Sequence, residues 1–280
     1  MSYWQSKRAL ILGGSSGLGR ALAEVLLDRG ARVAIVGRGK EALDRTVTEL
    51  ATDDVELLTY TADVTRASDV ERLAIQLKEH WHGIDFVVNA AGRSMRGDAI
   101  TTAPEAFQEL WELNFLSAVR VAQAFTSDLV HSRGHLVFIG SLAGKCAPRY
   151  LGAYPASKFP LAAFAQQLRL ELGPRGLHTL LVSPGPIARN SHSVGGVSDA
   201  DSGTSRYAEQ TAGLPASASR PGGGARLNLL DPVVLSKKIL TACESRQPEL
   251  VVPAKTKLLF ALAQLWPTFA DRILQKKTSE

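Results

Sequence analysis

Residues 8–19, RALILGGSSGLG, join a short apolar run to a glycine-rich turn. Beyond the turn, apolar residues recur with helical spacing at Leu22, Val25 and Leu26 as far as Gly30. The order is therefore strand, tight turn, helix. Glycines in such a turn let the backbone approach a pyrophosphate, which can lie at the positive N-terminus of the helix.

The same alternation of short apolar strands and amphipathic helices continues along the chain. It predicts strands at 33–36, 55–60, 86–88, 136–139, 179–182 and 250–252, and helices at 41–50, 67–80, 104–129, 153–172, 231–244 and 256–276. Thr65 or Ser68 is the expected N-cap of the helix at 67–80, and Pro267 interrupts the last helix. Almost continuously apolar strands are typical of a parallel sheet that is buried on both faces. We therefore predict a single α/β domain with a doubly wound, Rossmann-like parallel sheet.

One segment breaks the alternation. Residues 189–226 are rich in Gly, Ser and Ala and lack sustained periodicity. Because ligands of open α/β sheets bind outside the carboxyl ends of the strands, we interpret this segment as a mobile substrate lid rather than an idle loop. The predicted organisation is a catalytic domain at 1–253 that includes the lid, followed by an amphipathic helical tail at 254–280.

Composition narrows the function classes. The 280 residues are 45% hydrophobic and 21% charged, as in an ordinary globular protein. The net charge of +5 is spread along the chain without a nucleic-acid-binding motif, so no nucleic-acid partner is expected. Cys146 and Cys243 lack metal-ligand spacing, which favours a reduced cytoplasmic protein without a metal site. We expect neither a signal peptide nor a membrane span.

Tyr154 and Lys158 lie four residues apart in YPASK, on a predicted helix, so the phenol and the ammonium project from one face. A cation beside a phenol favours the phenolate, which makes the pair a candidate general acid/base. The same spacing also arises where a tyrosine packs and a lysine is solvated. Ser141 follows an apolar run thirteen residues before Tyr154.

Several motifs in register resemble the short-chain dehydrogenase/reductase family over about residues 7–190. The glycine turn resembles the family's cofactor loop, Asp63 with Val64 its adenine-contacting pair, and NAAG at 89–92 its N-N-A-G segment. The resemblance implies catalytic roles for Asn114, Ser141, Tyr154 and Lys158. It implies cofactor contacts from Gly13, Ser15, Ser16, Gly17, Leu18, Gly19, Arg38, Asp63, Val64, Asn89, Ala90, Ala91, Gly92, Tyr154, Lys158, Pro184, Gly185 and Ile187.

The end of the second predicted strand bears on the choice of cofactor. NAD-binding proteins usually place an acid there, whereas an arginine accommodates the 2′-phosphate of NADP. Gly37 followed by Arg38 favours NADP(H), with Arg20 or Lys40 able to share the role, and NAD(H) stays open. Arg189 stands where many relatives hold the nicotinamide carboxamide with threonine, so that contact is expected from the backbone near Ile187.

The family resemblance implies hydride transfer between a nicotinamide and a small-molecule ketone or secondary alcohol. Tyr154 would exchange the proton and Ser141 would hydrogen-bond the reacting oxygen. Lys158 would lower the tyrosine pKa and bind the ribose, while Asn114 would hold a water that links Lys158 to solvent. An apolar or lipid-like substrate is expected, because the residues predicted to line the pocket are Leu142, Ala143, Leu151 and those around Val194 and Val197.

Alternatives remain for the function and for the tail. A catalytically silent dinucleotide-sensing regulator would suit the same fold, as would an epimerase or dehydratase that uses the same tyrosine. In the tail, lysines flank an apolar stretch with Trp266 and Phe269. Packing on the domain or on a second subunit is favoured there over peripheral contact with an anionic membrane, which stays open. The resemblance also implies a homodimer or homotetramer paired through the helices at 104–129 and 153–172.

Overall fold

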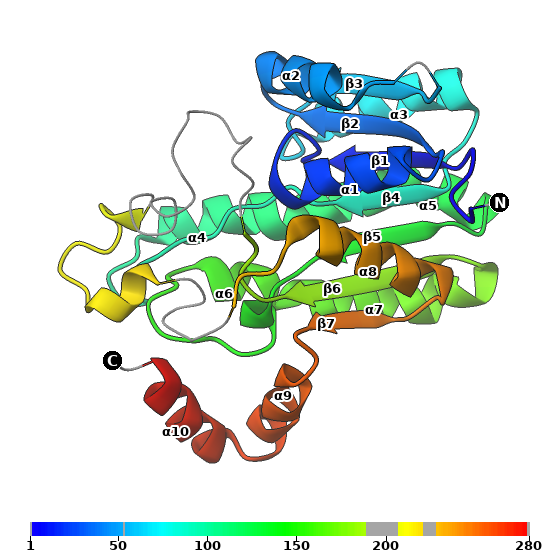
Figure 1. The fold of residues 1–280 in the computed structure, drawn as a ribbon. Coiled ribbons are helices and arrows are strands. Elements are labelled where there is room, and N and C mark those ends of the chain that lie inside the picture. The colour runs from blue at the N-terminus through cyan, green and yellow to red at the C-terminus, as the bar shows by residue number, and fades with distance from the viewer. Residues whose placement is uncertain (1, 53, 189–206, 221–227, 279–280) are drawn as a thin grey trace.

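The computed structural model describes residues 2–52, 54–188, 207–220 and 228–278. These residues contain one parallel sheet of seven strands in the order β3-β2-β1-β4-β5-β6-β7 (Figure 1). The strands are β1 (Arg8–Leu12), β2 (Arg32–Gly37), β3 (Leu57–Thr61), β4 (Phe86–Asn89), β5 (His135–Ile139), β6 (His178–Pro184) and β7 (Glu249–Val252). The predicted doubly wound, Rossmann-like α/β fold is confirmed.

Helices cover both faces of the sheet (Figure 1). On one face α1 (Gly17–Leu27), α2 (Lys40–Leu50) and α8 (Pro232–Glu244) enclose one hydrophobic core. On the other, α3 (Ala67–Trp81), α5 (Ser117–His131) and α7 (Pro160–Leu172) enclose a second. The central strands β1, β4 and β5 are almost wholly buried, which explains their nearly continuous apolar sequence.

Two local predictions need correction. Neither Thr65 nor Ser68 caps α3: the N-cap residue is Arg66, and no side chain caps this helix. Thr65 instead donates its hydroxyl hydrogen to Asp63, which orders the turn after β3. The predicted helix at 104–129 is also not uniform, since a π-helical segment, Glu112–Leu116, separates α4 (Pro104–Trp111) from α5.

The direction of winding reverses between β1 and β4, because the chain moves outward from β1 to β3 and then returns to the other side. Parallel strands open a crevice for ligands at such a point, outside their carboxyl ends. Leu12 lies opposite Asn89 in the register of β1 and β4, so the glycine turn and the NAAG segment leave the sheet side by side.

The chain leaves β6 on a long excursion whose two ends meet. Ile187 forms a parallel bridge with Leu230, and the Leu230 amide donates to the Pro186 carbonyl at 2.8 Å. Much of the predicted lid, with Arg189, Val194 and Val197, lies outside the described residues. The described part, residues 207–220, is termed the strap below and includes a short 3₁₀ turn, Ala216–Ser219.

The tail forms two helices, α9 (Thr256–Leu265) and α10 (Pro267–Thr278), which extend from the end of β7 (Figure 1). The break falls at Trp266, directly before Pro267, which begins α10 instead of interrupting a helix. Ala270 is buried, whereas Leu258, Leu265, Trp266 and Phe269 are all more than half exposed. No helix within the described ranges is both long and apolar enough to cross a membrane.

Candidate active site

Tyr154, Lys158 and Ser141 converge at the carboxyl edge of the sheet. Tyr154 and Lys158 begin and end the short helix α6 (Tyr154–Lys158), so the four-residue spacing does place them on one helical turn. Ser141 follows β5 and caps a 3₁₀ turn by accepting a hydrogen bond from the Ala143 amide at 3.1 Å. Its hydroxyl also hydrogen-bonds the Tyr154 phenol. The two hydroxyls are therefore positioned to act on one substrate atom.

The pKa shifts of Tyr154 and Lys158 differ from the expectation that Lys158 lowers the tyrosine pKa. Burial raises the pKa of Tyr154, the Ser141 hydrogen bond lowers it, Tyr207 raises it and the Arg96 guanidinium lowers it. Burial also lowers the pKa of Lys158 to about 8, and the ammonium donates to the Ile139 carbonyl at 2.8 Å. Arg96, which the sequence analysis did not single out, is thus a cation that lowers the pKa of the phenol in this structure.

Asn114 lies within the π-helical segment between α4 and α5, and it is buried. Its carboxamide accepts from the Arg93 amide and donates to the Arg93 carbonyl, both at 2.9 Å. It also donates to the Ser157 hydroxyl at 2.8 Å. A π-bulge turns a side chain out of the regular helical register, and here it directs Asn114 toward α6.

Ser157 was missed by the sequence analysis although it belongs to YPASK. Its hydroxyl donates to the Tyr154 carbonyl at 2.7 Å and accepts from Asn114. A Cβ on Gly92 would lie 2.8 Å from the Asn114 side-chain oxygen and 3.3 Å from the Lys158 nitrogen. Asn114, Gly92 and Lys158 are therefore brought together as the resemblance implies, and Ser157 ties Asn114 to the backbone of Tyr154.

The glycine turn fits a dinucleotide pyrophosphate. Gly13 has a φ of +81°, and a Cβ there would lie 2.8 Å from the Ala91 amide nitrogen. A Cβ on Gly19 would lie 2.1 Å from the Gly13 carbonyl oxygen. Around Gly17, by contrast, no described atom would lie within 4 Å of a Cβ. The Ser16 side chain does not cap α1, so the turn presents an open, uncapped helix N-terminus suited to an anion.

Arg38 lies exposed just after β2. Among the described residues, no hydrogen bond or ion pair to its side chain is found. The other two candidate cations are engaged: Arg20 pairs with Glu24 and Glu49, and Lys40 pairs with Asp44 at 2.8 Å. Of the three, Arg38 is the one positioned to reach a ligand at the end of β2.

The Asp63 carboxylate is held by hydrogen bonds within the turn that follows β3. Its carboxylate accepts from the Thr65 amide at 3.0 Å and from the Thr65 hydroxyl at 2.7 Å. Burial raises the pKa of Asp63, but these hydrogen bonds and the charges of Arg38 and Arg66 outweigh it and hold the pKa below its usual range. The carboxylate is therefore ionised and acts as an acceptor. Val64 next to it is buried in the second core, so its backbone is the part available to an adenine.

The Asn89 side chain holds the loop at Ala90–Gly92 in place through hydrogen bonds. It is buried, donates to the Ser117 hydroxyl at 3.0 Å and accepts from the Ala91 amide at 3.2 Å. We therefore assign its side chain to holding the loop Ala90–Gly92 against α5, and leave its backbone to the ligand.

Gly185 follows β6, and a Cβ there would lie 3.5 Å from Leu142. Pro184, Gly185 and Ile187 thus border the same crevice from the β6 side.

Comparisons with known proteins agree with this geometry. The family model described as short chain dehydrogenase matches residues 7–194. The chain is a short-chain dehydrogenase/reductase. It is 31% identical to the zebrafish (Danio rerio) dehydrogenase/reductase SDR family member 7B, over 98% of this chain and 86% of the relative. A Drosophila melanogaster SDR family protein 7-like is 27% identical over 97% of this chain and 80% of the relative. A solved short-chain dehydrogenase from Streptomyces avermitilis superposes with a TM-score of 0.77 at 25% identity, covering 98% of this chain and 97% of that one.

The dehydrogenase has a further set of residues beside Tyr154 that no sequence motif marked. The strap docks on the loop after β4, where the Tyr207 and Ser94 hydroxyls are hydrogen-bonded to each other. Gln210 accepts a hydrogen bond from the Arg96 amide at 2.8 Å. The one usable signal in the sequence is that Arg96 follows shortly after the NAAG segment, at the carboxyl end of β4.

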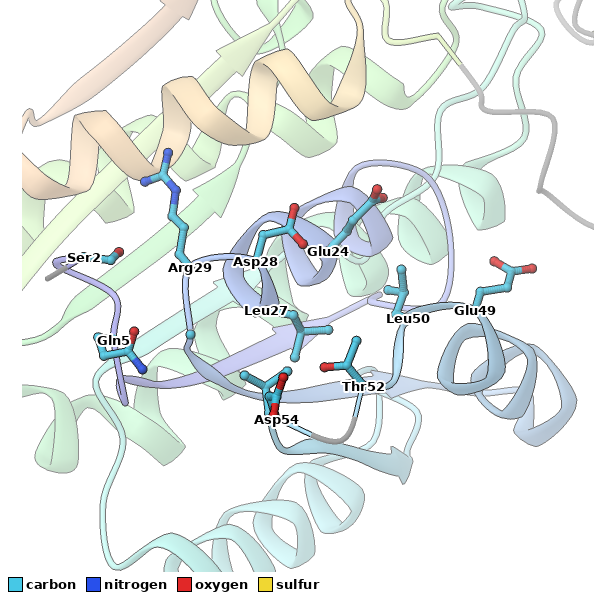
Figure 2. Close-up of a pocket in the computed structure, with 12 residues that line it drawn as sticks. Ser2, Gln5, Glu24, Leu27, Asp28, Arg29, Glu49, Leu50, Thr52 and Asp54 are labelled. Atoms are coloured by element: carbon cyan, nitrogen blue, oxygen red, sulfur yellow. The ribbon is translucent and has the colours of Figure 1, made fainter.

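A cavity of about 680 Å³ lies at the other end of the dehydrogenase (Figure 2). Gly30 and Val55 line it just before β2 and β3, so it opens at the amino ends of these strands, away from Tyr154. Glu24 and Glu49, which also line it, are already paired with Arg20. We therefore assign the catalytic chemistry to the carboxyl edge of the sheet and not to this cavity.

His135, His178 and Cys243 of the dehydrogenase form a buried cluster whose potential ligand atoms lie within 4.8 Å of one another. The imidazoles hydrogen-bond each other through their Nδ1 atoms at 2.8 Å, and His178 also contacts the Gln247 carbonyl. Burial raises the pKa of the Cys243 thiol. Both imidazoles are thus hydrogen-bonded within the fold.

Proposed function

We propose that this short-chain dehydrogenase/reductase is an NADP(H)-dependent oxidoreductase that interconverts a ketone and a secondary alcohol. The observation that carries the proposal is the convergence of the Tyr154 and Ser141 hydroxyls with the Lys158 ammonium at the carboxyl edge of the sheet. This edge is also where the glycine turn leaves an open helix N-terminus for a pyrophosphate. The residues of the glycine turn would hold the pyrophosphate of a bound nucleotide.

The chemistry follows from the protonation states. When bound, NADPH supplies a hydride from nicotinamide C4 to the carbonyl carbon. Tyr154, whose pKa is raised by burial, is protonated at neutral pH and donates its proton to the oxygen that becomes an alkoxide. Ser141 donates a hydrogen bond to the same oxygen as negative charge develops. The Lys158 ammonium stabilises the phenolate that remains, and Asn114 orients the turn that carries both.

The preference for NADP(H) is supported by Arg38. Arg38 has no hydrogen-bond or ion-pair partner among the described residues, and an arginine at the end of β2 can form a charge-assisted, bidentate hydrogen bond with a 2′-phosphate. Asp63, the nearby acid, is already satisfied by Thr65 and lies after β3 rather than β2.

An apolar substrate is supported by the side chains around the Ser141–Tyr154 turn. Ala143 and Leu151 are buried beside it, and Leu142 is partly exposed and faces Gly185. Apolar walls with a few placed hydroxyls are typical of small-molecule sites. We therefore propose a ketone or secondary alcohol with an apolar or lipid-like body.

The direct test replaces the proton donor. Tyr154→Phe removes only the hydroxyl, and loss of one such donor typically lowers kcat by about 10²–10³-fold. We expect NADPH oxidation, followed by absorbance with a panel of aliphatic, steroid and β-ketoacyl ketones, to fall by at least that factor. NADPH binding, measured by fluorescence titration, should change little.

Two results would contradict the proposal. One is a Tyr154→Phe variant that turns over at the wild-type rate. The other is a wild-type protein that binds NADPH but reduces no ketone in the panel, which would favour the silent dinucleotide-sensing regulator.

We also propose that the tail is a contact surface for an anionic membrane. Packing on the domain does not cover its apolar face, because Leu258, Leu265, Trp266 and Phe269 remain exposed. Lys257, Arg272 and Lys276 are exposed on the same two helices, and the exposed Lys255 directly precedes the first. Apolar and aromatic side chains flanked by cations suit the interface of an anionic bilayer better than the face of a second copy with the same charge.

A further inference from the structure

Arg96 is a buried cation in a place where no motif predicts one. Its side chain is only 6% exposed. The guanidinium carbon lies 4.2 Å from the centroid of the Tyr207 ring, and Nη1 donates to the Met95 carbonyl at 2.9 Å. Nη2 donates to the Arg220 carbonyl at 3.4 Å. A buried charge is tolerated only where hydrogen bonds and ring contacts replace water, so these contacts keep Arg96 in place.

These contacts join two distant parts of the chain. Tyr207, Gln210 and Arg220 belong to the strap, and all three reach the loop at Ser94–Arg96. The strap is therefore attached to this loop at both of its ends, through Tyr207 at the start and the Arg220 carbonyl at the finish. The planar guanidinium lies over the Tyr207 ring and donates hydrogen bonds in its own plane. It is therefore the group that contacts both ends of the strap.

The loop is in turn attached to the segment that leads into Tyr154. Gly97 forms a parallel bridge with Leu151. Its amide donates to the Tyr150 carbonyl at 3.1 Å, and its carbonyl accepts from the Gly152 amide at 2.9 Å. Arg96 is therefore adjacent to Gly97, which is hydrogen-bonded to both chain neighbours of Leu151. Leu151 itself lies three residues before Tyr154. These contacts hold the loop that carries Arg96 against the segment that leads into Tyr154, in agreement with the effects of Arg96 and Tyr207 on the Tyr154 pKa.

We propose that Arg96 is a positioning residue of the reaction: its guanidinium holds the strap beside Tyr154 through Tyr207 and places a fixed positive charge near the reacting hydroxyl. The strap then forms one wall of the substrate pocket. This inference rests on the proposed function, since it assigns Arg96 a part in the same proton transfer. A purely structural arginine would stabilise the fold without changing the ionisation of Tyr154.

Three variants separate the contributions of the Arg96 charge, of the planar shape of its guanidinium and of the Tyr207 hydroxyl. Arg96→Met removes the charge and the planar donors, whereas Arg96→Lys keeps the charge but loses the stacking geometry. Tyr207→Phe keeps the ring and removes the hydroxyl that bonds Ser94. Arg175→Met is the matched control, because Arg175 is exposed at the amino end of β6, far from the carboxyl edge.

The first readout needs no turnover. The Tyr154 phenol is titrated by ultraviolet difference absorbance, with the Tyr154→Phe protein as the reference for the other tyrosines. We expect its midpoint to move to higher pH in Arg96→Met, to move to lower pH in Tyr207→Phe, and to stay near the wild-type position in Arg96→Lys and Arg175→Met. An unmoved midpoint in a folded Arg96→Met protein, judged by circular dichroism, would overturn the electrostatic part.

The second readout is ketone reduction with NADPH by the full-length protein. Misplaced pocket walls commonly lower turnover strongly, and we expect kcat/KM to fall roughly tenfold in both Arg96→Met and Arg96→Lys. Amide hydrogen exchange in the strap should accelerate in both variants and not in Arg175→Met. Unchanged kcat/KM and unchanged exchange in Arg96→Met would overturn the positional part.

The two readouts also separate this inference from the proposed function. If the wild-type protein reduces no ketone but Arg96→Met still moves the Tyr154 midpoint and loosens the strap, the reductase assignment fails and the role of Arg96 in the site stands. If the wild type is active and Arg96→Met leaves both the midpoint and kcat/KM unchanged, the inference fails alone.

Discussion

At the scale of single residues, Arg38 differs from Arg20 and Lys40 because none of the described residues forms an ion pair or a hydrogen bond with its side chain. Arg20 and Lys40 already have carboxylates, so their charges are largely offset. We expect Arg38→Ala to weaken NADPH binding by about 10- to 100-fold, the range of one charge-assisted hydrogen bond, and to leave NADH binding almost unchanged. Fluorescence titration with both nucleotides measures this. Lys40→Ala is the control, and an equal loss for both nucleotides in Arg38→Ala would refute the 2′-phosphate contact.

Burial shifts Tyr154 and Lys158 in opposite directions, because it disfavours whichever form is charged. With a pKa near 8, Lys158 carries its charge below that pH and loses it above. The phenolate left by proton transfer then lacks its neighbouring cation. We expect kcat/KM for ketone reduction to decline as the pH rises through about 8, measured at saturating NADPH. A profile that stays flat well above this pH would show that Lys158 keeps its charge.

At the scale of elements, the tail is the part whose apolar face is left uncovered. We expect the full-length protein to sediment with phosphatidylserine vesicles and not with phosphatidylcholine vesicles. Replacing both Trp266 and Phe269 by serine should abolish sedimentation, since aromatic side chains supply much of the interfacial binding. Ile100→Ser, at an exposed apolar residue far from the tail in sequence, is the control. Vesicle-independent dimerisation that the double variant disrupts would point to a second copy instead.

At the scale of the whole molecule, a chain of hydrogen bonds ties four separate segments together. His178 Nε2 must donate to the Gln247 carbonyl at 2.8 Å, because a carbonyl only accepts. A neutral His178 therefore accepts at Nδ1 from His135 Nδ1–H, and His135 Nε2 accepts from the Tyr3 hydroxyl at 2.7 Å. The order of donors holds only while both imidazoles are neutral.

This chain makes the stability of the fold depend on pH. Burial lowers the pKa of both imidazoles, that of His135 to about 3, against 6.5 for an ordinary histidine. The unfolded chain binds protons below pH 6.5 and the folded chain does not, so stability is complete above that pH and is lost on acidification. The His135 imidazole should cost about 1.4 kcal/mol per pH unit over this window, and His178 should add to the loss in the same direction. Urea unfolding at pH 7 and pH 5 measures it.

A matched pair of variants checks the origin of that loss. His82→Asn alters an exposed histidine and should keep the full pH dependence. His178→Gln removes one of the two buried imidazoles and should reduce it. A free energy of unfolding that is the same at pH 7 and pH 5 in the wild-type protein would show that the imidazoles are protonated in the folded state.

The sequence alone determined the α/β class, the order of the elements and the family motifs, because these signals are local. Apolar periodicity reports burial within one helix or strand, and the glycine turn and the Tyr154–Lys158 spacing each span a few residues. The predicted caps at Thr65 and Ser68 were wrong. A residue type that favours capping also has other possible partners, and Thr65 here donates to Asp63 instead. The π-helical segment at Asn114 was missed because it is a change of register and not of composition.

Only the tertiary structure decided which side chains meet across the crevice. Ser94 and Tyr207 are 113 residues apart, and Asn114 and Ser157 are 43 apart. Such pairs leave no periodic trace in the sequence, since each partner is an ordinary polar residue until the sheet order brings their loops to one edge. Arg96 shows the difference most clearly: its charge is evident in the sequence, but its burial beside Tyr154 results from the folded positions of the strap and the loop after β4.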